Sequence, residues 1–172
     1  MTHPLLEDNI RCIRHAILRL QGLSDETYTC APCTPIGASL GAQFRHILDH
    51  YTCLLRGIHA GVIDYDTRPR QRIIEQDRLC ALDAFQDAST GLASLSSADL
   101  ARPLGIRLRA GEAAEHLLGV VPTSLTRELH FTMMHSVHHL AMISAELAAR
   151  GTPCRDDFGL APSTRAWRRS QR

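Results

Sequence analysis

The stretch from Ser124 to Arg150 decides the fold, and it reads SLTRELHFTMMHSVHHLAMISAELAAR. Its apolar residues recur at three- and four-residue steps, which predicts one long amphipathic helix. Gly151 and Pro153 follow it and are typical of a helix end. The residues of the predicted apolar stripe are Leu125, Leu129, Met133, Leu140, Ile143 and Leu147.

Two histidines in this stretch, His135 and His139, stand four residues apart. A helix places such residues on one face, one turn above the other. Two imidazoles in this arrangement can bind one divalent metal, as other helical His-x₃-His pairs do. They can also simply pack and form hydrogen bonds on a helix face. The neighbouring His138 points elsewhere, and we expect it at the surface or at an interface.

A second His-x₃-His pair, His46 and His50, lies far upstream in the predicted helix Ala38 to Val62. At about 100° per residue, His50 flanks the apolar stripe of this helix closely and His46 lies one step further round. Asp49 falls on the solvent side, where it would be a solvated carboxylate unless it turned back to orient a histidine ring. Catalytic zinc typically has three protein ligands and one open position, so two helices could supply the set. The two pairs together predict a metal pocket.

Two further segments, Pro4 to Leu20 and Gln71 to Leu95, show the same helical spacing of apolar residues. Between the third and the last helix, Leu104, Ile106 and Leu108 alternate with polar residues or glycine, which predicts a short hairpin within residues 102–122, with a helical turn over Glu112 to Leu118 as the alternative. Four long amphipathic segments with one irregular stretch predict an all-α four-helix bundle. We expect a single domain over residues 1–172, of which about 153–172 form a C-terminal tail.

Composition narrows the possible partners. The chain has 172 residues, of which 44% are hydrophobic and 22% charged, values typical of a globular protein. A formal net charge of +1 favours neither nucleic-acid nor membrane-surface binding. The sequence has no apolar run of bilayer length, and Met1 to Arg11 lacks the apolar core of a signal peptide. We therefore expect a cytoplasmic protein.

The six cysteines are scattered along the chain, and we expect them to be reduced. Cys30-Ala31-Pro32-Cys33 is the one Cys-x-x-Cys motif. A second such motif is missing, which argues against a zinc ribbon. The motif also does not lie between a predicted strand and a helix, which argues against a thioredoxin-like redox site.

Motifs for other metal and cofactor chemistries are absent from the sequence. It contains no Glu-x-x-His of the ferritin-like di-iron type, no His-Glu-x-x-His of the zincin type and no phosphate-binding Gly-x₄-Gly-Lys. Neutral imidazoles suit zinc, nickel, copper or iron, so ligand type alone does not fix the metal. No residue is marked as a nucleophile, and the catalytic residues therefore stay unknown.

At two places the sequence resembles the DinB-like (DinB/YfiT) superfamily of metal-dependent enzymes. His46-Ile47-Leu48-Asp49-His50 is similar to the family segment that supplies the first ligand, and Met134 to Ile143 is similar to the segment that supplies the other two. Carried over residue by residue, the resemblance implies His46, His135 and His139 as metal ligands. Helical phase instead favours His50 beside the core, so His50 is an alternative or additional ligand.

The resemblance further implies a four-helix bundle, often a homodimer, with one divalent ion per chain, commonly nickel or zinc. Characterised relatives include thiol-dependent S-transferases and isomerases. We therefore expect a metal-dependent hydrolase or thiol S-transferase that activates water or a low-molecular-weight thiol at a three-histidine site. Two alternatives stay open. One is a non-catalytic metal-binding or stress-response bundle protein, and the other is a bundle whose histidines only pack while its dimer surface carries the function.

Overall fold

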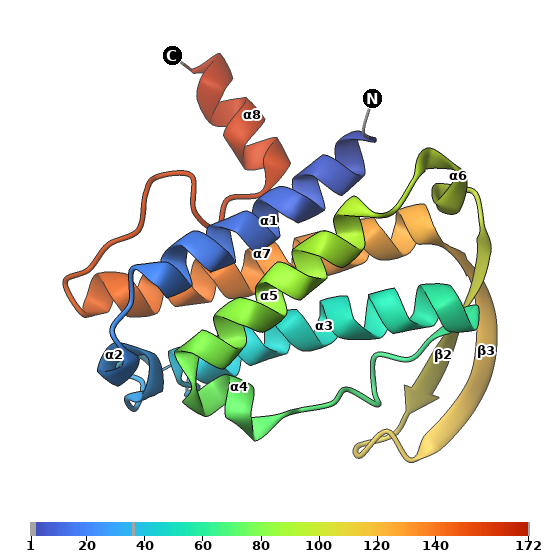
Figure 1. Ribbon diagram of the computed structural model, residues 1–172, viewed down its shortest axis with the longest axis horizontal. Coiled ribbons are helices and arrows are strands. Elements are labelled where there is room, and N and C mark those ends of the chain that lie inside the picture. Colours follow the sequence, from blue (N-terminus) through green and yellow to red (C-terminus); the bar gives the residue numbers. More distant parts are fainter. Residues whose placement is uncertain (1–2, 36, 172) are drawn as a thin grey trace.

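The computed structural model describes residues 3–35 and 37–171, and most of them are helical (Figure 1). The four long helices are α1 (Pro4–Gln21), α3 (Leu40–Ala60), α5 (Arg78–Ala93) and α7 (Leu125–Ala149). They pack together, with α1 against α5 and α7, and α3 against the same two helices. A small three-stranded sheet stands at one end of this helical body, so the all-α prediction holds only for the larger part of the chain.

Local capping fixes where the two histidine-bearing helices begin and end. Ser39 precedes α3, and its hydroxyl accepts a hydrogen bond from the backbone N–H of Ala42. Gly61 ends α3 in the left-handed conformation (φ 77°), which favours glycine. Ser124 caps α7 in the same way as Ser39 caps α3, because its hydroxyl accepts from the N–H of Arg127. These caps are readable from the sequence, and the predicted helix bounds agree closely with them.

The predicted continuous helix over residues 71–95 is wrong in one respect. It is divided into α4 (Arg72–Gln76) and α5, and Asp77 between them is extended (φ −127°, ψ 110°). The Asp77 carboxylate accepts hydrogen bonds from the backbone N–H groups of Leu79 and Cys80, so it starts a new helix instead of continuing the first. Apolar residues recur at helical steps on both sides of Asp77, so the periodicity predicted one helix and gave no sign of this cap.

Three short helices lie outside the four predicted helical segments, and the last of them lies in the predicted C-terminal tail. They are α2 (Asp25–Thr29), α6 (Ser97–Leu100) and α8 (Pro162–Ser170). α8 has no buried residue and projects from the long helices, with Trp167 63% exposed (Figure 1). Among the helices of the described residues, none combines the length and apolarity needed to cross a bilayer.

The predicted hairpin is confirmed. β2 (Pro103–Ala110) and β3 (His116–Ser124) pair in antiparallel fashion, with Ile106 opposite Val121. The third strand, β1 (Val62–Ile63), was not predicted and pairs with β2 in parallel. Two residues are too short to show an alternating pattern, and β1 exists only because α3 delivers it to the edge of the hairpin.

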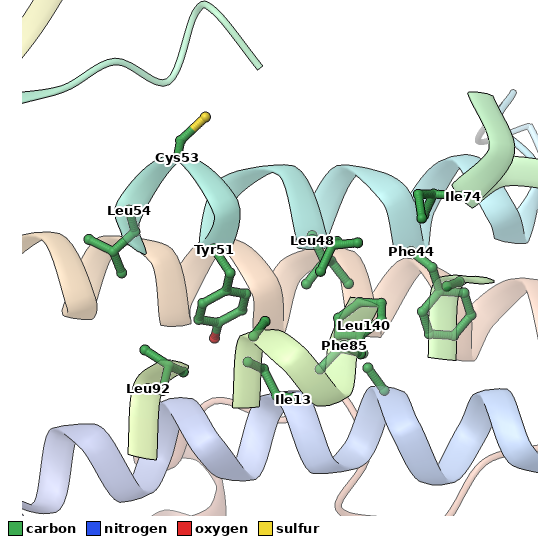
Figure 2. Packing of buried hydrophobic residues seen from close by; sticks show 14 of the residues in the cluster. Ile13, Phe44, Leu48, Tyr51, Cys53, Leu54, Ile74, Phe85, Leu92 and Leu140 are labelled. Carbon is green, nitrogen blue, oxygen red and sulfur yellow. The ribbon is translucent and has the colours of Figure 1, made fainter. Parts of the chain in front are cut away.

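The core lies between the long helices and contains several aromatic side chains that pack against one another (Figure 2). Phe44 of α3 meets Phe85 of α5 edge to face, with ring centroids 6.1 Å apart. Tyr51 is fully buried and its hydroxyl donates to Asn9 Oδ1 at 3.1 Å. Burying such a side chain stabilises the fold by about 1.5–3 kcal/mol, so these contacts fix the position of α3 relative to its neighbours.

Candidate metal centre

Helices α3 and α7 pack against each other and bring all four predicted histidines together. His46 Nε2 lies 2.8 Å from His135 Nε2 across the interface. The rings of His50 and His135 have centroids 4.0 Å apart, and those of His46 and His139 are 4.4 Å apart. Two pairs that are 89 residues apart in the chain therefore form one cluster, as the sequence predicted.

Within the cluster, His46, His50 and His135 form the closest group of possible ligands. One ring nitrogen from each lies within 4.8 Å of the others. His139 lies beside this group, with its ring centroid 4.6 Å from that of His135. The structure thus includes His50, which helical phase favoured, while His139, which the family resemblance favoured, stands directly next to the trio.

His139 is oriented by a residue to which the sequence analysis assigned no role. Its Nδ1 lies 2.6 Å from Gln43 Oε1. An amide oxygen can only accept, so His139 donates from Nδ1 and its Nε2 carries the free lone pair. Gln43 lies on α3 one turn before His46, so its helical spacing places it on the same face as that histidine and could have identified it.

The burial and hydrogen bonding of His50 show whether these residues fit a metal. Its side chain is buried, with 4% of the residue exposed, and neither Nδ1 nor Nε2 has a hydrogen-bond partner among the described residues. A buried polar group without a partner is costly, by about 1–3 kcal/mol. Coordination of a divalent ion would satisfy one of these nitrogens, and imidazole is a common ligand for zinc and nickel. The donor set fits a metal.

The electrostatics of the cluster keep the imidazoles neutral at physiological pH. Burial, together with the neighbouring histidines, lowers the pKa of His46 to about 4 and that of His139 to about 3. For His50 the same causes lower the pKa to about 2, and burial also lowers the pKa of His135. A neutral ring has a lone pair to donate, whereas a protonated ring cannot bind a cation. The site is therefore in the protonation state that metal binding requires.

Aromatic side chains cover the cluster on one side. Tyr65 stacks on His50 with ring centroids 5.2 Å apart, and Phe131 stacks on His135 at 5.8 Å. The Tyr65 hydroxyl and Thr132 Oγ1 are 3.2 Å apart and share a hydrogen bond in the buried region. These contacts restrict the two imidazole rings and place aromatic surface on this side of the cluster.

Asp49 is not the solvated carboxylate that helical phase predicted. It is 4% exposed, and its Oδ2 lies 2.7 Å from Arg45 Nη1 while its Oδ1 accepts from the backbone N–H of Arg70. Arg45 also pairs with Glu75. Among the described residues Asp49 has no hydrogen bond to a histidine, so it anchors the segment after β1 and does not orient an imidazole. His138 is exposed, as predicted.

Comparisons with known proteins add little to this geometry. No family model matches the chain, and no solved structure matches it. Over 103 residues, 60% of its length, the chain is 31% identical to FK506-binding protein 5 of Rhizopus delemar. The matched part is 26% of that protein, so the chain corresponds to about a quarter of this relative.

Proposed function

We propose that this chain is a divalent-metal-binding protein of the DinB-like class, in which three histidines hold one ion that activates water or a low-molecular-weight thiol. The observation that carries the proposal is the convergence of His46, His50 and His135, whose ligand atoms lie within 4.8 Å of one another. The packing of four long helices, with a hairpin before the last one, supports the assignment to this class.

Two ligand sets are compatible with the proposal, and they share His46 and His135. The family resemblance adds His139 as the third ligand, whereas the approach of the ring nitrogens within 4.8 Å of one another adds His50. The number of ligands matters chemically. Three protein ligands leave one coordination position open for water or substrate, while four close a tetrahedral site and make it structural. An enzyme therefore needs one of these two rings to stay outside the coordination sphere.

The chain's own residues have distinct tasks in this proposal. Neutral His46 and His135 supply lone pairs from opposite helices, and Gln43 holds His139 with its Nε2 free. Tyr65 and Phe131 place aromatic surface on one side of the cluster. A bound zinc or nickel ion would act as a Lewis acid, and zinc can lower the pKa of bound water to about 7. The substrate is a small molecule that the activated water or the activated thiol attacks. Attack by water corresponds to a hydrolase, and attack by a thiol corresponds to a thiol S-transferase.

Metal analysis of the purified protein tests the proposal directly. We expect about one zinc or nickel ion per chain, because three imidazoles form one catalytic-type site. The double variant His46→Ala, His135→Ala should lose the ion, while His138→Ala, an exposed neighbour on α7, should keep it. Single variants His50→Ala and His139→Ala then identify the third ligand, and loss in both indicates a closed four-ligand site. Equal metal content in the wild type and the double variant would refute the proposal.

A non-catalytic metal-binding or stress-response role is the second candidate, and the burial of His50 favours it. A buried imidazole that coordinates an ion ties α3 to α7 and stabilises the folded state. In that case chelation lowers the melting temperature while hydrolase and thiol-transfer assays show no turnover. Turnover that depends on added metal and is lost in the double variant would decide for the enzyme. We also propose a homodimer, which sedimentation equilibrium measures.

A further inference from the structure

The Cys-x-x-Cys motif lies against the C-terminal end of α7, between α2 and α3. Its two sulfurs contact the two members of one ion pair. Arg150 Nη1 donates to Cys30 Sγ at 2.7 Å, and the Cys33 thiol donates to Glu146 Oε1 at 3.1 Å. Arg150 Nη2 closes the arrangement with a 2.6 Å hydrogen bond to the same Glu146 oxygen. The sequence alone did not indicate this pairing.

The two cysteines have different electrostatic surroundings. The Cys30 thiol donates to the backbone carbonyl of Thr27 at 3.2 Å, while its sulfur accepts from the Arg150 guanidinium. A cation beside a cysteine sulfur stabilises the thiolate, which is the nucleophilic form. For Cys33 the hydrogen bond to Glu146 raises the thiol pKa, so Cys33 stays protonated. The first attack on a disulfide is therefore assigned to Cys30, which contacts the cation, and Cys33 keeps its proton until the second step.

Glu146 is a permanent carboxylate in this arrangement. Burial raises its pKa, but hydrogen bonds from Thr34, Cys33 and Arg150 outweigh burial and lower the pKa to about 2. The backbone N–H groups of Cys33 and Thr34 also donate to it, at 2.8 and 3.0 Å. Glu146 therefore holds the loop even when one sulfur contact is removed.

The cysteines of the loop are accessible. Cys33 is exposed and Cys30 partly exposed, and residues 31–34 belong to no helix or strand. Cys12 and Cys53 are protected, because burial raises the pKa of the Cys12 thiol to about 12 and that of the Cys53 thiol to about 11. Reactivity toward disulfides follows thiolate character and access, so the Cys30–Cys33 loop is the preferred place for it.

We propose that Cys30 and Cys33 form a reversible dithiol–disulfide site that reacts with low-molecular-weight disulfides. The Cys30 thiolate attacks one sulfur of the disulfide RSSR, which forms a Cys30–SR bond and releases RS⁻. The Cys33 sulfur then attacks Cys30 Sγ, the Cys30–SR bond breaks, and the Cys33 proton goes to the departing thiolate. Two cysteine thiols are oxidised and one RSSR is reduced to two RSH. The proton that Cys30 loses when it becomes a thiolate goes to the first RS⁻ released. The site is separate from the metal centre and needs no metal.

Glutathione disulfide is a suitable probe with the full-length reduced protein. We expect a product whose mass is lower by two hydrogens, and peptide mapping should find Cys30 linked to Cys33. In Cys33→Ser the second step is blocked, so a glutathione adduct should persist on Cys30. Arg150→Gln removes the charged hydrogen bond to the Cys30 sulfur, so it should slow the reaction at Cys30 about tenfold or more. Cys80→Ser is the matched control and should react like the wild type.

The wild-type peptide map needs no substitution, so the test does not depend on how well Arg150→Gln folds. Adducts spread over several cysteines without a Cys30–Cys33 link would overturn the proposal. So would a Cys33→Ser variant in which Cys30 gains glutathione no faster than Cys154. Arg150→Lys, which keeps the charge, should react faster than Arg150→Gln, and equal rates for all three proteins would remove the role assigned to the guanidinium.

Discussion

Acidification should destabilise the metal-free protein through its buried histidines, and His50 is the clearest case. In the folded protein burial lowers the pKa of His50 from 6.5 to about 2, whereas the unfolded chain has the ordinary value. Between these two values the unfolded state binds a proton that the folded state does not. Stability is therefore fully present above about pH 6.5 and is lost progressively as the pH falls below it.

The size of the effect at pH 5 does not depend on the exact folded value. His50 is 4% exposed, and at pH 5 its folded form is still neutral. One pH unit corresponds to about 1.4 kcal/mol, so the interval of roughly 1.5 units below the unfolded value costs about 2 kcal/mol. His46, His135 and His139 act in the same direction, and their partial exposure makes each contribution smaller. A loss of about 2 kcal/mol is large against a total stability of about 5–15 kcal/mol.

Urea unfolding in the presence of a chelator, at about pH 7.5 and about pH 5, measures this loss. The difference in unfolding free energy between the two pH values should be smaller in His50→Gln than in the wild type by about 2 kcal/mol. His138→Gln, which changes an exposed histidine on α7, should retain the wild-type difference. Comparing differences removes the contribution of carboxylates common to all three proteins. An identical pH difference in the wild type and His50→Gln would refute the reasoning, as would higher stability of the wild type at the lower pH.

Two further predictions concern packing. Gly57→Ala would place a Cβ 2.8 Å from Ile63 Cα, and overpacking of about 1–3 kcal/mol should exceed the helix propensity that alanine adds. Gly22→Ala, whose Cβ has ordinary contacts at 3.7 Å, is the control, and equal urea midpoints for the two variants would contradict the argument. Phe85→Ala removes a fully buried ring and should cost about 3–5 kcal/mol, whereas Leu79→Ala, 55% exposed, should stay within about 0.5 kcal/mol. A small loss in Phe85→Ala would show that the ring does not support the core.

Features encoded within a few neighbouring residues were predictable. The helices α1, α3 and α7 follow from apolar periodicity. The alternation at Leu104 to Leu108 correctly predicted the hairpin. Errors arose where a local signal competed with the periodicity, as at Asp77, or where a charged residue found a distant partner, as Asp49 did in the segment near Arg70.

The sequence by itself determined that four histidines occur as two pairs at helical spacing, and therefore that each pair shares one face of its helix. Only the tertiary structure decided which rings approach one another, because that depends on the rotation and axial shift of α3 relative to α7. Tyr51 of α3 is tied to α7 through Asn9, which accepts from the Tyr51 hydroxyl and donates to the Leu129 carbonyl, and in this packing His50 lies within the closest trio. The pairing of the Cys30–Cys33 loop with Arg150, 120 residues away, has the same origin. Residue spacing within one helix or loop does not specify which residues of another segment it contacts, because those contacts depend on how the two segments pack.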